Sequence, residues 1–266
     1  MTFPADYQPT ERFTGLAQLY SQFRPSYPGE ALNFIIDRCR LNEHSVLVDV
    51  GCGTGIASRQ FAERGIPVIG IEPNAEMRRQ AQTESLEAGG PTPQYRDGRA
   101  EDTGLLAASA DAVLAAQAFH WFEPEPALRE FHRILKPTGW AGLLWNQRDE
   151  SDPFTRAYGA GVRQLDVTEI IEPYHGRGEA LLASPLFQDG MHAFFPHEQI
   201  LDEAGLLGRA FSASYAPRNS GLAKQYADEI RKLFRQFEQD GSIIFRYETS
   251  VFLACRRALV SRSANL

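Results

Sequence analysis

The sequence predicts an α/β fold built on a seven-stranded, mostly parallel sheet with helices on both faces. Short apolar, β-branched runs alternate along the chain with amphipathic stretches of helical spacing. The clearest predicted strand, residues 45–50, stops at Gly51, Gly53 and Gly55, and a helical pattern follows. Strands alternating with helices over this length are typical of βαβ units, whose crossovers are right-handed.

The first 44 residues are predicted to form a helical cap. Apolar residues at helical spacing predict a short amphipathic helix over residues 12–23. Pro25 and Pro28 then prevent a continuous helix, and a second helix is expected over about residues 31–39.

Residues 45–145 are predicted to form the core that binds the ligand. Its five strands are expected at residues 45–50, 67–72, 94–96, 110–115 and 140–145. Helices are expected at residues 56–64, 74–87 and 123–135. The helix at 123–135 has the clearest apolar face, which should pack against the sheet.

The rhythm breaks over residues 146–200, which are polar and rich in proline and glycine. Short helical pieces are expected near residues 154–167 and 178–182. We interpret the stretch as an insert that lies over the strand ends as part of a lid, together with the N-terminal helices. A separate domain is not expected, because its own core would be thin.

Residues 201–266 are predicted to complete the sheet of a single domain over residues 1–266. A short helix at 201–204 is followed by a strand at 207–215 and an amphipathic helix at 222–237. The last strand, residues 243–255, is expected to run antiparallel to its neighbour, because no crossover helix is available for it.

Composition limits the possible functions. The chain has 266 residues, 43% of them hydrophobic, and a formal net charge of −7, which argues against a general nucleic-acid surface. No apolar run is long enough to span a membrane, and residues 1–6 do not look like a secretory signal. The three cysteines form no CxxC pair, which favours a reduced, cytoplasmic protein. His192 and His197 show no metal-ligand spacing, so no metal is expected.

The glycine turn and two flanking acids indicate the ligand. Ile56 and Ala57 follow the turn, so no glycine stands where a dinucleotide fingerprint needs its third. Glu72 ends the second strand, where an acid can accept hydrogen bonds from ribose hydroxyls. Asp49 would repel a pyrophosphate but attract a sulfonium or an amino group, which favours S-adenosylmethionine (SAM) over NAD. Alternatively, Asp49 only orders the turn and Glu72 only starts a helix.

Several motifs resemble those of the class I SAM-dependent methyltransferases, which have a Rossmann-like fold. They are Val48-Asp49-Val50-Gly51-Cys52-Gly53-Thr54-Gly55, Gly70-Ile71-Glu72-Pro73-Asn74-Ala75-Glu76-Met77, Ala100-Glu101-Asp102 and His132-Arg133-Ile134-Leu135-Lys136-Pro137-Thr138-Gly139. The resemblance covers about residues 12–146. The segments 13–17 and 24–28, with Tyr20, resemble a small-molecule subgroup that includes trans-aconitate methyltransferase-like (methyltransferase type 11) proteins.

The resemblance implies roles for individual residues. The glycine turn would pack on the methionine part of SAM, Glu72 would bind the ribose, and Gln117 would face the methyl donor. Pro73 and Met77 would lie near the adenine. The full set of implied cofactor residues is Asp49, Gly51, Cys52, Gly53, Gly55, Glu72, Pro73, Met77, Gly98, Ala100, Glu101 and Gln117.

The end of the fourth strand, residues 117–122, is the expected active centre, because ligands bind outside the carboxyl ends of strands in open α/β sheets. His120 is the candidate catalytic residue and could take a proton from an attacking hydroxyl or amine. Alternatively, it only hydrogen-bonds a backbone group. Positioning can supply much of the rate of methyl transfer, and a carboxylate acceptor would need no base.

Seven residues are candidates for contact with the substrate. Arg24 and Arg148 could clamp an anion, although each could equally form a surface salt bridge. Tyr20 and Tyr27 could close over the methionine part or contact substrate, or could only pack the N-terminal helices. Trp121, Trp145 and Asn146 are expected to line the pocket.

The sequence therefore favours a methyltransferase that uses SAM to methylate oxygen, nitrogen or a carboxylate of a small molecule. A SAM-fold protein that binds or assembles without methyl transfer is the alternative. An NAD oxidoreductase is disfavoured by the missing glycine and by Asp49. The acceptor and the oligomeric state stay open.

Overall fold

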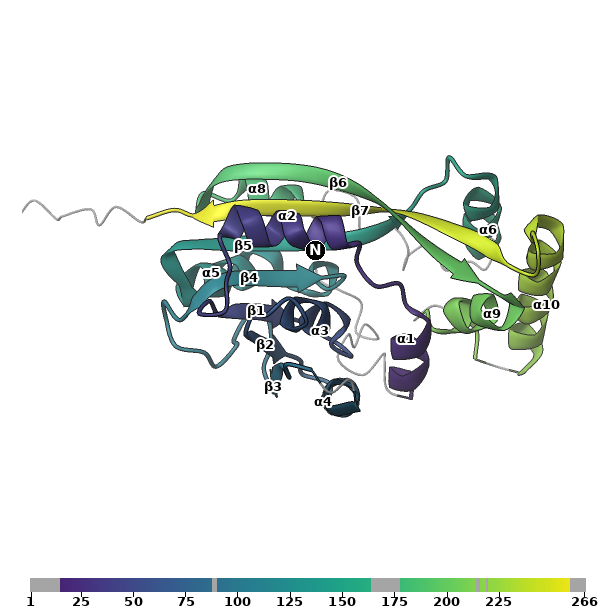
Figure 1. Cartoon of the computed structure of the whole chain (residues 1–266), viewed down its shortest axis with the longest axis horizontal. Coiled ribbons are helices and arrows are strands. Elements are labelled where there is room, and N and C mark those ends of the chain that lie inside the picture. Colours follow the sequence, from purple (N-terminus) through teal and green to yellow (C-terminus); the bar gives the residue numbers. More distant parts are fainter. Residues whose placement is uncertain (1–14, 88–89, 164–177, 214–215, 219, 259–266) are drawn as a thin grey trace, which may run out of the picture.

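The computed structural model describes residues 15–87, 90–163, 178–213, 216–218 and 220–258, and it contains one seven-stranded sheet (Figure 1). Its order is β3-β2-β1-β4-β5-β7-β6. Strands β1 to β5 are parallel, and β7 pairs antiparallel with both β5 and β6, as expected for the last strand. The strands are β1 Leu47–Val50, β2 Val68–Ile71, β3 Gln94–Arg96, β4 Ala110–Ala116, β5 Leu135–Arg148, β6 Phe187–Leu201 and β7 Ile243–Arg256. The predicted Rossmann-like sheet is confirmed.

Helices cover both faces of the sheet because side chains alternate along each strand. Leu47 faces α2 (Gly29–Cys39) and α3 (Ile56–Ala62), and its cluster includes Leu32 and Phe61. Val48 faces the other side, where α5 (Pro124–Ile134) and α8 (Glu179–Ala183) pack with Phe131. Helix α4 (Ala75–Glu87) lies against β3 at one edge. No helix of the described residues is long and apolar enough to cross a membrane.

A third cluster forms where β6 and β7 extend past the other strands (Figure 1, right). Helices α6 (Pro153–Arg163), α9 (Glu203–Phe211) and α10 (Ser220–Phe237) gather around Phe245 and Tyr247 of β7. Helix α1 (Ala17–Phe23) lies between this end and α4, and it contacts both α9 and α4. The N-terminal helix thus connects α4 with the cluster at the end of β6 and β7.

The prediction of a strand at residues 207–215 is wrong. Helix α9 occupies residues 203–211 instead, and residues 214 and 215 lie outside the described part. Asp202 caps the helix, because its Oδ1 accepts a hydrogen bond from Gly205 N at 2.7 Å. The short helix predicted at residues 201–204 is not a separate element, because Leu201 ends β6 and Glu203 begins α9.

The missing strand is β6, which lies inside the stretch interpreted as an insert. It pairs with β7 from Phe187 to Leu201, so residues 187–201 belong to the sheet and not to an insert over it. Pro196 fits because β6 is an edge strand, where a missing N–H is tolerated. Helices α6 and α8 match the predicted helical pieces, whereas residues 164–177 lie outside the described part.

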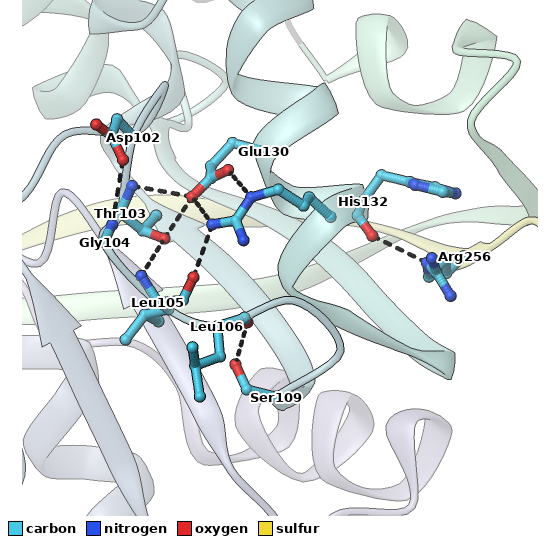
Figure 2. A network of polar contacts seen from close by, with 10 residues as sticks. Asp102, Thr103, Gly104, Leu105, Leu106, Ser109, Glu130, His132 and Arg256 are labelled. Atoms are coloured by element: carbon cyan, nitrogen blue, oxygen red, sulfur yellow. Dashed lines mark hydrogen bonds and ion pairs between the residues drawn. The ribbon is translucent and has the colours of Figure 1, made fainter.

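A buried polar network fastens the loop after β3 to α5 (Figure 2). Glu130 is 7% exposed and accepts hydrogen bonds from N and Oγ1 of Thr103, at 2.9 and 2.5 Å, and from Arg133 Nε at 2.6 Å. Burial alone would raise the pKa of Glu130, but the bonds from Arg133 and Thr103 outweigh it and lower that pKa. The network holds the loop that carries Ala100 and Glu101.

We therefore expect Glu130→Ala to lower the free energy of unfolding by about 2 to 4 kcal/mol, because Thr103 and Arg133 lose a buried, charged acceptor. Chemical denaturation measures the change. Glu125→Ala is the matched control on the same helix, since Glu125 pairs with Arg129 at the surface and should cost less than about 1 kcal/mol. Equal effects of the two substitutions would contradict the anchoring role of Glu130.

Candidate functional site

A cleft that is partly open to solvent lies at the carboxyl ends of β1, β2 and β4. The order of the strands reverses between β1 and β4, which is where open α/β sheets bind ligands. Its lining comes from α1, the glycine turn, the end of β2, the loop after β3 and the end of β4. The lining residues are Tyr20, Tyr27, Asp49, Gly51, Cys52, Gly53, Thr54, Ile56, Ala57, Glu72, Pro73, Met77, Arg99, Ala100, Glu101, Ala116, Gln117, Ala118, Trp121 and Phe122.

The turn after β1 requires glycine for conformation and for space. Gly51 and Gly55 have φ of +68° and +79°, which side chains rarely adopt. A Cβ on Gly51 would lie 2.7 Å from the Cβ of Ala118. The turn is fastened to β2, because the N–H groups of Gly51 and Cys52 both donate to Ile71 O, at 2.8 and 3.1 Å. Bare backbone therefore faces the cleft at a fixed distance from β2.

Glu72 connects the end of β2 to that turn. The side chain is 8% exposed, with Oε2 accepting from Gly53 N at 2.9 Å and Oε1 from Asn74 N at 2.8 Å. Burial raises the pKa of Glu72, and the two backbone bonds oppose that shift. A carboxylate has about four acceptor positions, so two remain for a ligand in the cleft.

Asp49 is the most deeply buried acid of the cleft, with 1% of its surface exposed. Its Oδ2 accepts from Ser58 Oγ at 2.6 Å, while Oδ1 has no hydrogen-bond partner in the described part of the chain. Burial raises the pKa of Asp49 to about 6, although the bonds from Ser58 oppose the shift. A cation in the cleft would relieve this unfavourable burial of charge.

The end of β4 holds a strained residue at the cleft. Gln117 has φ of +57°, which costs energy for a residue with a side chain. Its Nε2 donates to Asn146 O at 3.2 Å. The side chain of Asn146 in turn donates to Ser26 O at 2.9 Å and accepts from Thr249 Oγ1 at 2.6 Å. The network joins β4, β5, β7 and the segment before α2.

The N-terminal cap closes one side of the cleft through Tyr20 and Tyr27. Both carboxylate oxygens of Glu76, in the first turn of α4, accept from Gly15 N, at 3.0 and 2.9 Å. This contact fastens the start of the described part of the cap to the first turn of α4.

Most predicted cofactor residues line the cleft, and two do not. Gly55 caps α3, and a Cβ there would clash with the ring of Tyr95. Gly98 packs against Ile71 and the backbone of Thr103. Both glycines therefore leave room for the packing behind the cleft walls and do not line the cleft.

The predicted catalytic and substrate residues are dispersed. His120 is 2% exposed and lies behind the lining, with its Nδ1 3.5 Å from Trp145 Nε1. Trp145, 1% exposed, packs edge-on against Phe252 in the core, and the side chain of Asn146 points to the opposite face of β5, where it bonds to Ser26 and Thr249. Trp121 lines the cleft, whereas Arg24, Trp145, Asn146 and Arg148 are not among its lining residues.

Seven lining residues were not among the residues predicted individually for the site: Thr54, Ile56, Ala57, Arg99, Ala116, Ala118 and Phe122. Each lies within two positions along the chain of a predicted site residue, so position along the chain was the available signal. In the described residues, no group of three or more His, Cys, Asp or Glu side chains could hold a metal ion.

Comparison with known proteins agrees with this geometry. The sequence model of the family described as "Methyltransferase domain" matches residues 48–143. A methyltransferase-like protein of Schizosaccharomyces pombe, itself uncharacterized, is 30% identical over 247 residues, covering 88% of this chain and 91% of its own.

A second relative, an uncharacterized methyltransferase of Mycobacterium tuberculosis, is 38% identical over 140 residues. The match covers 53% of this chain and 54% of the relative, so the chain spans about half the length of that protein. The YcgJ protein from Bacillus subtilis has a similar fold, with a TM-score of 0.55 and 18% identity over 87% of this chain and 100% of its own. The chain therefore belongs to the class I SAM-dependent methyltransferases.

Proposed function

We propose that the cleft binds SAM and that the protein transfers its methyl group to oxygen, nitrogen or a carboxylate of a small molecule. The observation that carries the proposal is the pair of buried acids, Asp49 and Glu72, on either side of the glycine turn. SAM carries a sulfonium, an amino group and a ribose, and this lining suits all three. Two buried carboxylates would repel a pyrophosphate.

The residues present fit the cofactor part by part. The two remaining acceptor positions of Glu72 can take the ribose hydroxyls. Oδ1 of Asp49 can accept from the amino group or lie near the sulfonium. Pro73 and Met77 can contact the adenine ring, and Ala100 and Glu101 can line the adenine edge.

Bound SAM supplies an electrophilic methyl group on a cationic sulfur. An acceptor in the cleft would take this methyl carbon with its lone pair, the carbon–sulfur pair would stay on sulfur, and the cofactor would leave as S-adenosylhomocysteine (SAH). An alcohol or amine acceptor also loses a proton, whereas a carboxylate has none to lose. Gln117, which lines the cleft, would orient the acceptor, and such positioning can supply much of the rate.

The predicted role of His120 as general base stays a prediction. Its ring lies 4.7 Å from that of Trp121, which lines the cleft, so His120 can also act by holding that wall in place. The N-terminal cap, with Tyr20 and Tyr27, would exclude water from the methyl group, as lids do in many enzymes.

We expect Glu72→Ala to weaken SAM binding by about tenfold to a hundredfold, because a charged acceptor contributes about 1.5 to 3 kcal/mol. Isothermal titration with SAM measures the change. Glu87→Ala, at the exposed end of α4, is the control and should leave affinity unchanged. Glu72→Gln keeps one acceptor oxygen, so its affinity for SAM should lie between those of Glu72→Ala and Glu87→Ala. Unchanged affinity in a folded Glu72→Ala protein would rule out the ribose contact.

Binding of SAM should depend on pH through Asp49. The free protein holds a proton on Asp49 below pH about 6, and a bound cation lowers that pKa, so binding releases a proton. The affinity for SAM should therefore rise between pH 5 and 7, by at most about tenfold per pH unit. Above this range it should level off. Titrations across this range in Asp49→Asn should show weaker binding with a smaller slope. The same slope in both proteins would show that Asp49 does not face the cation.

A further inference from the structure

Basic side chains gather on one face of the sheet beyond the cleft. Arg148 of β5, Tyr247 of β7 and His197 of β6 are direct cross-strand partners, so their side chains share a face. The rings of His197 and Tyr247 lie 6.1 Å apart. Arg209 of α9 donates from Nε to the Tyr247 hydroxyl at 3.1 Å. The four residues form one row across three strands and a helix.

Arg24, just after α1, approaches the same place. Its Nη2 donates to Ser212 O, at the end of α9, at 3.3 Å. The preceding residue, Phe23, accepts through its O from Gln199 Nε2 at 3.0 Å. Gln199 Oε1 also accepts from the Tyr247 hydroxyl at 3.5 Å, which links the end of α1 to the row on the sheet. In Figure 1, α1 lies beside α9 at this end of β6 and β7.

Within the described ranges, neither Arg24 nor Arg148 forms an ion pair, so the surface salt bridges considered for them are not found there. Glu150 is paired with Arg163 at 2.7 Å, and Glu198 with Arg246 at 3.3 Å. The bond from Arg163 lowers the pKa of the Glu150 carboxyl most, and the charge of Arg148 also lowers it, so Glu150 offsets part of the charge of Arg148.

A donor position is also unused. Nε of Arg24 is buried without a hydrogen-bond partner in the described part of the chain. Leaving buried polar atoms unpaired is costly, which favours a ligand that supplies acceptors. Burial lowers the pKa of His197, and a hydrogen bond to the Ser26 backbone opposes that shift, so the single N–H of the neutral ring is already used by Ser26.

This group of residues lies within reach of the methyl-transfer end of the cleft. Arg148 follows Asn146 by two residues on the same face of β5, a spacing of about 7 Å. Asn146 O accepts from Gln117, which lines the cleft. The guanidinium of Arg24 stacks 4.8 Å from the ring of Tyr20, another lining residue. A small molecule could therefore contact both places at once.

We propose that Arg24 and Arg148 bind an oxyanion group of the acceptor, which makes the substrate a small organic anion. The proposal rests on the function proposed above. Guanidinium groups present planar, paired donors that match a carboxylate or a phosphate. Binding the anionic group in this place would direct another part of the acceptor to Gln117.

The test is isothermal titration of the full chain saturated with SAH. The probes are acetate, succinate, benzoate and inorganic phosphate, with acetamide, succinamide and benzamide as neutral counterparts. At least one anion should bind about tenfold or more tightly than its amide, because a charged hydrogen bond contributes about 1.5 kcal/mol or more. Arg148→Gln and Arg24→Gln should each lower the affinity for that anion by about tenfold, while Arg148→Lys should retain part of the affinity.

Arg129→Gln, an exposed arginine of α5, is the control and should leave anion affinity unchanged. SAH affinity should stay within about twofold of wild type in all variants, which shows that they fold. No preference for anions, or a preference that Arg148→Gln and Arg24→Gln leave intact, would overturn the anion subsite. Failure to bind SAH would instead overturn the cofactor assignment, and the same titrations on the free protein would then decide the subsite alone.

Discussion

The site depends on one buried carboxylate that joins two strand ends. Glu72 accepts from Gly53 N and Asn74 N, and so fixes the glycine turn relative to the start of α4. The turn is held a second time by the bonds from Gly51 and Cys52 to Ile71 O. Because both sets of bonds use backbone groups, the geometry is independent of most side chains in the turn. The ligand thus meets a rigid wall with an acid already oriented in it.

The fold brings other groups to this wall because parallel strands end at one edge. Strands β1, β2 and β4 contribute Asp49, Glu72 and Gln117 from positions far apart in sequence. The buried network of Glu130 keeps the loop after β3 against α5, beside the same cleft. Beyond Asn146, the long strands β6 and β7 extend the face towards Arg148 and His197. Cofactor and acceptor would then occupy neighbouring parts of one sheet edge.

Local patterns were sufficient to predict the first half of the chain. A glycine turn between an apolar run and a helix indicated where β1 ends. Asp49 and Glu72 were predicted for the site because they are acids at strand ends. The second half was harder, because β6 contains Gly190, Pro196 and many polar residues, which an edge strand tolerates and a buried strand would not. The run from Leu207 looked like a strand because the cap at Asp202 was not recognised. Contacts such as Arg209 with Tyr247 depend on tertiary packing and have no signal in sequence.

The central claim is that the two acids beside the glycine turn hold the cofactor. A crystal structure of the protein with SAH tests it most directly. The account predicts the ribose hydroxyls within hydrogen-bond distance of Glu72 and the amino group of the methionine part within reach of Asp49 Oδ1. SAH bound elsewhere, or in the cleft with its ribose turned away from Glu72, would contradict the account.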